Sequence, residues 1–551
     1  MSLWGSQQKQ NGHTDDTAAA DDTQPPTEHM ARRSGDSGRR EPTERDRLLP
    51  ATNDNGNIAR PPHADGYLDP DDPAVSPYNL WTVRALRFFS FLFLALTFLW
   101  WVLLLVSIFV SPPGLNTRGS GFFDFSYSCL TLGLLLCSLL FFGAPSLAMR
   151  VSLGVIGVLL LIDLIIIVSI HRLRNEEGPA GLASLVWAIF ISGWCILTDR
   201  VVTWGKREEE ERLTGRPETR RTLKEWLEVL VATVILAIYI VIAVLMTGTL
   251  ILRARDAGLE LDGARYLVDG EKYRVHLACV GDAIQNSTRV PTVLLEAGET
   301  PLEYDFEHWA YAAYKNGTIP RYCYWDRPGY AWSDNAPSPH SAGMSADNLA
   351  EALARADEQG PWILVSAGYG TIVTRIFSAR NFRNVAALLL IDPLHEDLLH
   401  TLANPTNGFL LWAEGILSPL GIQRLPGALF KGRTREDRVY GRSAGSGGKL
   451  LKAHLQESLV ADSLTKSEVA SARTIQSVDT PLVVISSGIH VRSDDEWARK
   501  QQDLTKLTDN LQSWDVVGKA PHMVWRTLKG REVMEERVGE LVKGVKGKMM
   551  E

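Results

Sequence analysis

A turn between a short apolar strand and the start of a helix is where this chain could attack a substrate. Residues 362–365 read Trp-Ile-Leu-Val, and Ser366-Ala-Gly368-Tyr369-Gly370 follows. A strand, a sharp turn and a helix in this order project the side chain at the apex of the turn, which is where a nucleophile stands in one class of acyl-transfer site. The apex residue here is Gly368. Because glycine has no side chain to attack a carbonyl, the sequence predicts this scaffold without its usual acyl chemistry.

Two neighbours of Gly368 carry hydroxyl groups. Ser366 lies two positions before the apex, where a small residue lets strand and helix pack closely, and its hydroxyl would leave the strand rather than the turn. Tyr369 follows the apex, but a phenol with a pKa of about 10 is a poor nucleophile without strong activation. We expect Ser366 to serve packing, and a nucleophile relocated to it is the alternative.

Short apolar strands alternate with helical stretches after Arg253, which is typical of a doubly wound α/β sheet. The predicted strands cover 273–279, 292–296, 322–325, 363–365, 386–391, 482–485 and 511–517. Helical stretches within about 396–475 predict a cap inserted between two strands. Such caps usually shape an apolar ligand cavity.

Several motifs of this region occur in an order that carries a resemblance: Glu296-Ala-Gly298, Asp326-Arg-Pro-Gly-Tyr-Ala-Trp-Ser-Asp334, the turn at Gly368, Leu390-Ile-Asp-Pro-Leu-His-Glu-Asp397 and Pro521-His522. They resemble the landmark motifs of the α/β-hydrolase superfamily over about residues 265–546. The whole layout is similar to a fungal multi-spanning membrane family of unknown function whose C-terminal part is such a domain. The expected fold is a helical transmembrane bundle of about five spans followed by an α/β-hydrolase-fold domain with a helical cap.

The superfamily resemblance also implies roles for individual residues. It implies an oxyanion hole made by the backbone N–H of Tyr369 and a second N–H near Gly298 or Glu299. It implies that His522, in the turn after the last strand, is the general base, and a structural histidine is the alternative.

The acid that would orient His522 stays open between two aspartates. Asp392 follows one predicted strand, and Asp494 follows the next strand a few residues later than the superfamily pattern expects. Either aspartate is equally compatible with a helix cap or a turn.

A retained scaffold without a nucleophile predicts a domain that binds a lipid-like ligand or a protein partner. The alternative hypothesis is an active membrane-tethered esterase or lipase that uses an atypical residue. The net charge of −7 on 551 residues, without zinc-finger or RNA-binding spacing, argues against nucleic acid. The five cysteines show no CxxC spacing, and we predict neither a metal nor a cofactor.

The N-terminal part divides into a polar tail and a membrane region. Residues 1–75 hold too few apolar side chains to offset the entropy of ordering, which predicts a disordered cytosolic tail. Apolar stretches predict five membrane spans, in contact with membrane lipids, inside a transmembrane region at 76–255: 88–110, 122–143, 151–170, 180–198 and 228–252. The hydrolase-like domain then occupies 256–551. Asp163, inside the third span, predicts a hydrogen bond between helices, with an ion path as the alternative.

Charge and sequons predict the orientation in the membrane. The loop 199–226 carries eight Lys and Arg residues, whereas the connection 111–121 carries only Arg118, so the former should be cytosolic. Five spans then place the N-terminus in the cytosol and the C-terminal domain in a lumen. The sequons at Asn286 and Asn316 fall on that lumenal side and predict glycosylation.

Two further features bear on the compartment. Glu44, Leu48 and Leu49 fit the acidic dileucine pattern ExxxLL, an address towards vacuoles or lysosomes, and a chance match of so short a pattern is the alternative. We expect an endomembrane such as the vacuole, and a mitochondrial membrane is the alternative. Cys279 and Cys323 fall on strands that are neighbours in the superfamily's sheet order. In an oxidising lumen they would form a disulfide, and two buried thiols are the equal alternative.

Overall fold

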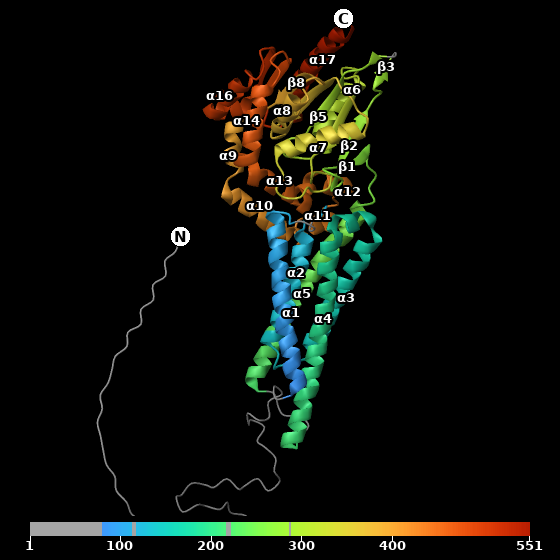
Figure 1. The fold of residues 1–551 in the computed structure, drawn as a ribbon, viewed down its shortest axis with the longest axis vertical. Coiled ribbons are helices and arrows are strands. Elements are labelled where there is room, and N and C mark those ends of the chain that lie inside the picture. Colours follow the sequence, from blue (N-terminus) through green and yellow to red (C-terminus); the bar gives the residue numbers. More distant parts are fainter. Residues whose placement is uncertain (1–79, 113–116, 216–221, 286–287, 551) are drawn as a thin grey trace, which may run out of the picture. The chain divides into compact units, whose positions relative to one another are not determined.

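The computed structural model describes residues 80–112, 117–215, 222–285 and 288–550. Five of its helices are long and apolar enough to cross a membrane, which confirms the five predicted spans, and Figure 1 shows them side by side: α1 (Trp81–Phe109), α2 (Phe122–Leu140), α3 (Leu147–Ser169), α4 (His171–Thr214) and α5 (Leu223–Asp256). The predicted tail, the sorting residues Glu44, Leu48 and Leu49, and the sequon asparagine Asn286 lie outside the described residues.

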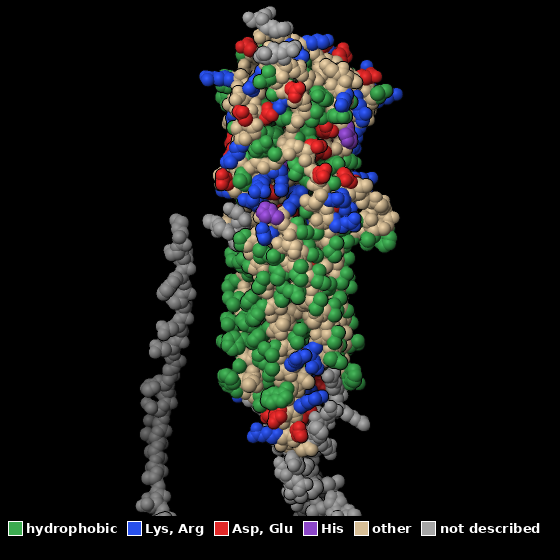
Figure 2. All heavy atoms as spheres, turned by 90° about the vertical axis from the view of Figure 1, so that its right-hand side faces the viewer, with side chains coloured by type: hydrophobic (Ala, Val, Ile, Leu, Met, Phe, Trp, Pro, Cys, Tyr) green, Lys and Arg blue, Asp and Glu red, His purple; other side chains and the backbone are tan. Residues whose placement is uncertain are grey.

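The outer surface of these helices is apolar and their polar groups face inward. Figure 2 shows a hydrophobic band with charged side chains gathered at both of its ends. Side chains such as Phe98 and Val158 are more than half exposed, which fits contact with lipid rather than water. Asp163 is buried and accepts a hydrogen bond from the Tyr127 hydroxyl of α2 at 3.1 Å. This is a polar contact between helices of the kind predicted for Asp163.

An eight-stranded sheet follows the helices, with the strand order β1-β2-β6-β5-β7-β8-β9-β10. Only β2 runs in the opposite direction to the other seven strands of this sheet. This order and this single reversed strand are those of the α/β-hydrolase fold, which confirms the predicted fold class. The strands are β1 (Ala264–Val268), β2 (Tyr273–Val280), β5 (Thr292–Glu296), β6 (Tyr322–Asp326), β7 (Trp362–Ala367), β8 (Val385–Ile391), β9 (Leu482–Ser487) and β10 (Leu511–Val517).

The sequence pattern found every central strand because these strands are buried on both faces and read as apolar runs. It missed the edge strand β1, most of which is partly buried, and the two-residue strands β3 (Ile284–Gln285) and β4 (Thr288–Arg289), which are largely exposed. Cys279 and Cys323 are direct partners in the β2–β6 register and form a disulfide in this structure.

Helices cover both faces of the sheet (Figure 1). One core cluster packs α6 (Phe306–Lys315) and α17 (Leu528–Met550) against the sheet. The other packs α7 (Ala342–Arg355), α8 (Gly370–Arg380), α14 (Lys466–Ile475) and α16 (Asp495–Leu504) against the opposite face. The short helix α15 (Gly488–Ser493) follows β9 directly.

Short helices fill the segment predicted as a cap. They are α9 (Leu399–Leu402), α10 (Pro405–Leu417), α11 (Arg424–Phe430), α12 (Arg435–Val439) and α13 (Gly448–Val460), followed by α14. Within the cap, α10 contacts α2, and α11 and α12 contact α5. Arg438 of α12 forms an ion pair with Asp256 at the end of α5, with 2.5 Å between Nη2 and Oδ1. The cap therefore joins the sheet to the membrane helices.

Candidate functional site

The turn between β7 and α8 has the backbone of a nucleophile turn and no side chain at its apex. Gly368 adopts a φ of +49°, in the left-handed region that favours glycine. Its N–H donates to the carbonyl of Ile391 at the end of β8, at 3.1 Å. A Cβ atom added to Gly368 would lie 2.8 Å from Glu299 Oε2 and 2.9 Å from His522 Nε2. Other groups of the chain therefore occupy the space of the missing side chain.

The side chain of Glu299 fills the place where an oxyanion would bind. Glu299 follows β5, and its Oε1 accepts a hydrogen bond from the Tyr369 N–H at 3.0 Å. The backbone N–H of Glu299 itself also interacts with this carboxylate. Tyr369 and Glu299 are two of the predicted oxyanion donors, and the third candidate, Gly298, offers its carbonyl to Arg327 Nη2 at 2.5 Å. The donors are present, and an internal carboxylate already uses them.

His522 lies between two carboxylates. Its Nδ1 lies 2.6 Å from Asp392 Oδ2, and its Nε2 lies 3.3 Å from Glu299 Oε2. Asp392, directly after β8, is fully buried and also accepts hydrogen bonds from the Ser487 N–H and the Trp497 indole. We call Glu299, Asp392 and His522 the elbow trio.

Of the two candidate acids, the structure places Asp392 beside the histidine and Asp494 elsewhere. Asp494 is the N-cap of α16, and its Oδ1 accepts from the Glu496 and Trp497 N–H groups at 2.9 and 3.1 Å. This is the helix-cap role that the sequence left open for it.

Two members of the elbow trio, Glu299 and His522, have pKa values that keep them charged across a wide pH range. Burial by itself raises the pKa of the Glu299 carboxyl, but His522 and the N–H groups of Tyr369 and Glu299 lower it to about 2. Burial by itself lowers the pKa of His522, but the hydrogen bonds and charges of Asp392 and Glu299 raise it to about 10. At neutral pH the imidazole therefore already carries the proton that a general base would have to accept.

No hydroxyl or thiol in the described part of the chain makes a hydrogen bond to His522. The Ser366 hydroxyl is fully buried in β7 and has no hydrogen-bond partner among the described residues. The Tyr369 phenol is buried as well, and burial raises its pKa far above its usual value. Neither geometry supports the hypothesis of a relocated hydroxyl nucleophile.

Polar contacts fix the segments that carry the trio. Arg327, from the motif that starts at Asp326, donates to Glu296 Oε1 at 2.6 Å and to the carbonyls of Ala297 and Gly298 at 2.5 Å each. It thereby holds the turn before Glu299. The motif that contains Arg327 is visible in the sequence, but this positioning role is not, because it depends on how two loops meet.

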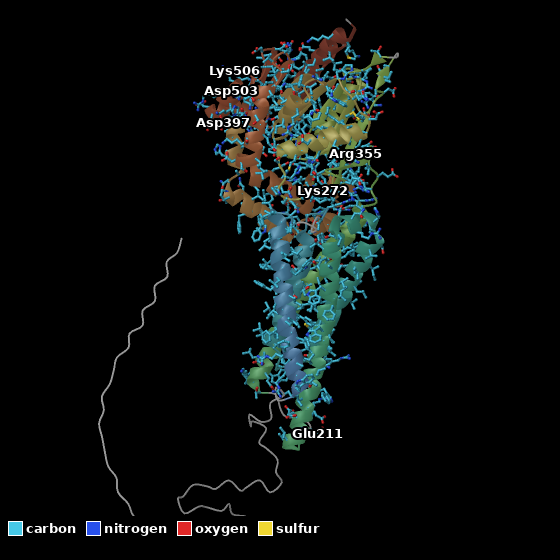
Figure 3. All side chains as sticks on the ribbon, in the orientation of Figure 1. Glu211, Lys272, Arg355, Asp397, Asp503 and Lys506 are labelled. Carbon is cyan, nitrogen blue, oxygen red and sulfur yellow. A yellow bond between two sulfur atoms is a disulfide. The ribbon has the colours of Figure 1, made fainter. Side chains whose placement is uncertain are left out.

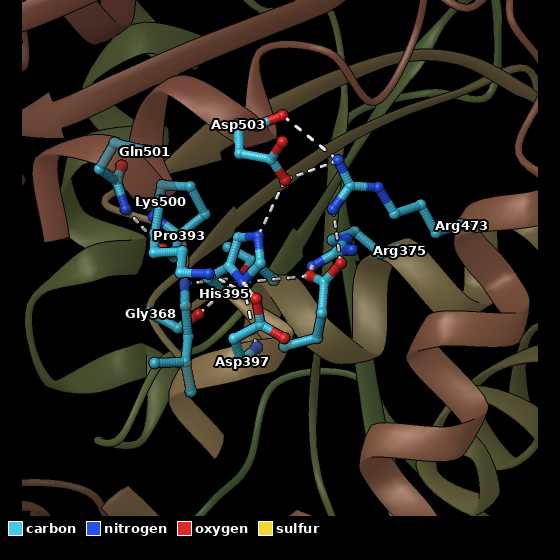
Figure 4. Close-up of polar contacts among 12 residues, drawn as sticks. Gly368, Arg375, Pro393, His395, Asp397, Arg473, Lys500, Gln501 and Asp503 are labelled. Carbon is cyan, nitrogen blue, oxygen red and sulfur yellow. Dashed lines mark hydrogen bonds and ion pairs between the residues drawn. The ribbon is translucent and has the colours of Figure 1, made fainter. Parts of the chain in front are cut away.

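A second set of contacts holds the segment after Asp392, which Figure 4 shows in close-up. The Leu394 N–H donates to the carbonyl of Gly368 at 3.3 Å. His395 lies 3.0 Å from Asp503 through its Nε2 and Oδ2, and Arg473 lies 2.7 Å from the same carboxylate. His395 therefore belongs to this supporting network and not to the elbow trio.

A cavity of about 350 Å³ opens above the elbow trio. Glu299 and Tyr369 lie at its base, and its walls include Leu402, Leu410 and Leu411 of the cap. The Glu299 side chain is 43% exposed there. The site can therefore admit a small ligand over a floor whose charges are already paired.

Among the described residues, three groups bring three possible metal ligands close together. One contains Asp392, His522 and His490, whose ring stacks on His522 with centroids 5.6 Å apart. The second contains the disulfide cysteines. The third is a buried trio of His276, Asp326 and Glu303. In the first group the short contact between His522 and Asp392 already uses both ligand atoms, so a metal would have to replace that contact.

Of the two sequon asparagines, only Asn316 lies within the described residues, and it is exposed. Asn316, at the end of α6, donates from its amide to Glu535 Oε1 at 2.9 Å. Attachment of a glycan would require this amide nitrogen to leave that contact.

The comparisons with known proteins agree with this architecture. Residues 44–279 match a family described as a region of unknown function (DUF2417). An uncharacterised protein of Schizosaccharomyces pombe is 33% identical over 538 residues, which cover 91% of this chain and 97% of that protein. An uncharacterised vacuolar membrane protein of Saccharomyces cerevisiae is 27% identical over 393 residues, which cover 61% of this chain and 60% of that protein.

Solved structures that resemble the C-terminal half are α/β-hydrolases of low identity. An α/β-hydrolase enzyme from a deep-sea metagenome library has 11% identity and a TM-score of 0.38, covering 50% of this chain and 96% of its own. An epoxide hydrolase from Vigna radiata has 16% identity and a TM-score of 0.37, covering 52% of this chain and 98% of its own. The fold assignment rests on the strand order, not on these scores.

Proposed function

We propose, since this chain belongs to the same family as the Schizosaccharomyces pombe protein, that it is a vacuolar membrane protein whose α/β-hydrolase-fold domain binds a lipid-like ligand without hydrolysing it. One observation carries the proposal. The carboxylate of Glu299 occupies both the oxyanion hole and the space above Gly368.

Ester hydrolysis by this fold needs three things at the elbow, and Glu299 opposes each of them. A side-chain nucleophile at Gly368 would collide with the Glu299 carboxylate. The Tyr369 N–H, which would stabilise a tetrahedral oxyanion, is already bound to an anion. His522 is held in its protonated form, in which it cannot accept a proton from a nucleophile. The open cavity remains, and binding is the function that it supports.

An esterase assay on the full-length protein in detergent tests the proposal. Wild type and Gly368→Ser should hydrolyse p-nitrophenyl esters no faster than His522→Ala, and a fluorophosphonate probe should label neither. Glu299→Ala combined with Gly368→Ser should become labelled, because the double variant frees both the oxyanion hole and the apex. The matched control is Asp494→Asn with Gly368→Ser, which leaves Glu299 in place and should stay unlabelled.

One observation favours a second candidate function, a hydrolase that uses Glu299 as its nucleophile. Its carboxylate is ionised, faces the cavity and lies 3.3 Å from His522. In that case wild type would turn over an electrophilic substrate and Glu299→Gln would not. Wild-type turnover that disappears in Glu299→Gln would contradict the binding proposal and establish the second.

We also propose that the hydrolase-fold domain faces the vacuolar lumen. The first part of the predicted basic loop, up to Thr214, is helical and forms the end of α4, and Figure 3 shows Glu211 of this part and Lys272 of the domain at opposite ends of the membrane helices. A lumenal domain should carry endoglycosidase-sensitive glycans. Asn316→Gln with Asn286→Gln should abolish the mobility shift, and a chain without any glycan would count against this orientation.

A further inference from the structure

The cap presents an apolar surface that no described part of the chain covers. Two stretches carry it: α10, and the segment that continues from it through α11. The exposed side chains are Phe409, Leu410, Leu417, Ile422, Leu429 and Phe430, of which Leu429 is 70% and Phe430 83% exposed. Six large apolar side chains exposed within 22 residues form the kind of patch that marks an interaction surface.

The contacts of this surface with α5 indicate how deep in the membrane it lies. Leu425 lies against Gly248, whose added Cβ would be 3.1 Å from Leu425 Cδ2, and Gly421 packs against Thr249. Gly248 precedes Arg253, the first charged residue after the apolar run of α5, by five residues. At about 1.5 Å of rise per residue, these contacts lie roughly 7 Å on the membrane side of Arg253. Interfacial helices bury their apolar faces to a similar depth.

The neighbouring surface of α5 faces lipid at the same level. Ile251 is 44% exposed and Val244 is 50% exposed, so apolar side chains of α5 face outward at the level where α11 packs against this helix. On the other side of the cap, Gly415 of α10 packs directly on the ring of Phe122 at the start of α2. The apolar surface of the cap thus adjoins the lipid-facing surface of the helices.

The same helix α10 also forms a wall of the cavity above the elbow trio. Leu410 and Leu411 line the cavity, while Phe409 and Leu417 are exposed on the membrane-facing surface of the cap. We propose that α10 and α11 lie in the leaflet next to the hydrolase-fold domain, and that a membrane lipid enters the cavity along α10 without crossing water. This inference rests on the proposed binding function and names the class and the route of its ligand.

The charges of the cavity select the class of lipid. Its carboxylates are Glu299, Glu414 and Glu457, its described lining contains no Lys or Arg, and the Nε2 of its one histidine, His454, lies 3.0 Å from the carbonyl of Glu299. Glu299 is paired with His522, and Glu457 is paired with Arg327 at 3.1 Å. An anionic phosphate headgroup would meet these carboxylates, whereas a hydroxyl headgroup could donate a hydrogen bond to one of them. The ligand is therefore an uncharged lipid with a hydroxyl headgroup, such as a diacylglycerol or a sterol.

A fluorescence-quenching experiment tests the position of the cap. A single free cysteine at Phe430→Cys, with Cys129, Cys137 and Cys195 replaced by serine and the Cys279–Cys323 disulfide kept, carries an environment-sensitive label in phosphatidylcholine vesicles. Phosphatidylcholine with a spin label on its acyl chain should quench this label. Phe382→Cys is the matched control, because Phe382 is also an exposed phenylalanine, 50% exposed, and lies after α8, away from the cap. A label at 430 that only aqueous iodide quenches would overturn the insertion.

Photo-crosslinking tests the ligand and its route. A photoactivatable diacylglycerol in phosphatidylcholine vesicles should crosslink to α10 or α13, and phosphatidic acid with the same chains should crosslink far less. Leu410→Trp, which narrows the cavity, should lower crosslinking by roughly tenfold, while Phe382→Trp, away from the cap, should leave it unchanged. Thermal unfolding of both variants checks that they fold.

The outcomes separate this inference from the proposed function. Equal crosslinking by both lipids would overturn the lipid class, and no crosslinking in the cavity would overturn the entry of a lipid. After either result, the proposal that the site does not hydrolyse esters would still hold, provided that the esterase assay is negative. Ester hydrolysis by wild type would instead overturn the proposed function, whatever the crosslinking shows.

Discussion

Two clusters of this domain contain the same three kinds of side chain, and the pKa values of their glutamates are shifted in opposite directions. The elbow trio is Glu299, Asp392 and His522, and the buried trio is Glu303, Asp326 and His276. In the buried trio, His276 Nδ1 lies 2.8 Å from Asp326 Oδ2 and 3.7 Å from Glu303 Oε1. In the elbow trio the two acids lie at opposite ring nitrogens of His522, whereas in the buried trio both acids lie on the Nδ1 side of His276.

The two glutamates differ in what donates to them. Glu299 receives backbone N–H groups and the imidazole, and its pKa is lowered to about 2. Glu303 has no hydrogen-bond partner for either oxygen among the described residues, and burial and the charge of Asp326 raise its pKa well above the usual value. Donors directed at the carboxylate, rather than the composition of the cluster, therefore decide which glutamate stays ionised.

The largest expected effect comes from removing the buried imidazole. His276 is fully buried, and its Nε2 also lies 2.6 Å from the carbonyl of Asp262. His276→Ala would remove the imidazole from Asp326 and from the Asp262 carbonyl and leave two acids close together in a buried site, so we expect a loss of about 3–5 kcal/mol in the free energy of unfolding. Chemical unfolding of the full-length protein in detergent measures it.

The matched variant is His522→Ala in the elbow trio. The His522 side chain is 26% exposed, and Asp392 keeps its Ser487 and Trp497 donors, so the loss should be smaller, about 1–3 kcal/mol. An equal or larger loss for His522→Ala would show that the deeper burial of His276 does not make its contribution to the free energy of unfolding the larger one.

The next effect has the opposite sign. Glu303→Gln should raise the melting temperature at pH 7, because it replaces a carboxyl that resists ionisation in the folded state. A carboxyl whose folded pKa is raised destabilises the fold once the pH rises above its unfolded pKa of about 4.3. The gain should therefore disappear at pH 4. A variant that is less stable than wild type at pH 7 would show that Glu303 is ionised and paired.

The sequence predicted the scaffold well, because buried parallel strands and membrane spans are long apolar runs that local pattern alone identifies. It also singled out Gly368 and His522 and left two aspartates as possible partners of His522. That Asp392 lies beside His522 and Asp494 does not could not be predicted, since it depends on where the loops after β8 and β9 end in space. The side chain of Glu299 was missed for the same reason: its position next to Gly298 is visible, but its turn into the oxyanion hole is a tertiary contact held by Arg327.

The corresponding change in the elbow trio, Glu299→Gln, should destabilise the protein. The His522 contribution is present below pH 6.5 and is lost as the pH rises through about 10, because its folded pKa is raised. The Glu299 contribution is present above about pH 4.3 and is lost as the pH falls through about 2, because its folded pKa is lowered. We expect a loss of about 1 kcal/mol near pH 5.5, reduced by the exposure of Glu299 to water. A Glu299→Gln variant that is more stable than wild type would show that Glu299, like Glu303, destabilises the folded protein.

The smallest effect should come from Ser366→Ala, and it tests whether the elbow trio has a hidden hydroxyl partner. The Ser366 hydroxyl is buried without a hydrogen bond among the described residues, so its removal costs no interaction. We expect the free energy of unfolding to change by less than about 0.5 kcal/mol, with the pKa of His522 unchanged by NMR titration. A hydroxyl that did serve His522 would behave differently, because its loss would shift that titration. Such a shift would show that a hydroxyl at this turn is bonded to His522 and can act as a nucleophile. The site could then no longer be described as one that is closed by its own carboxylate.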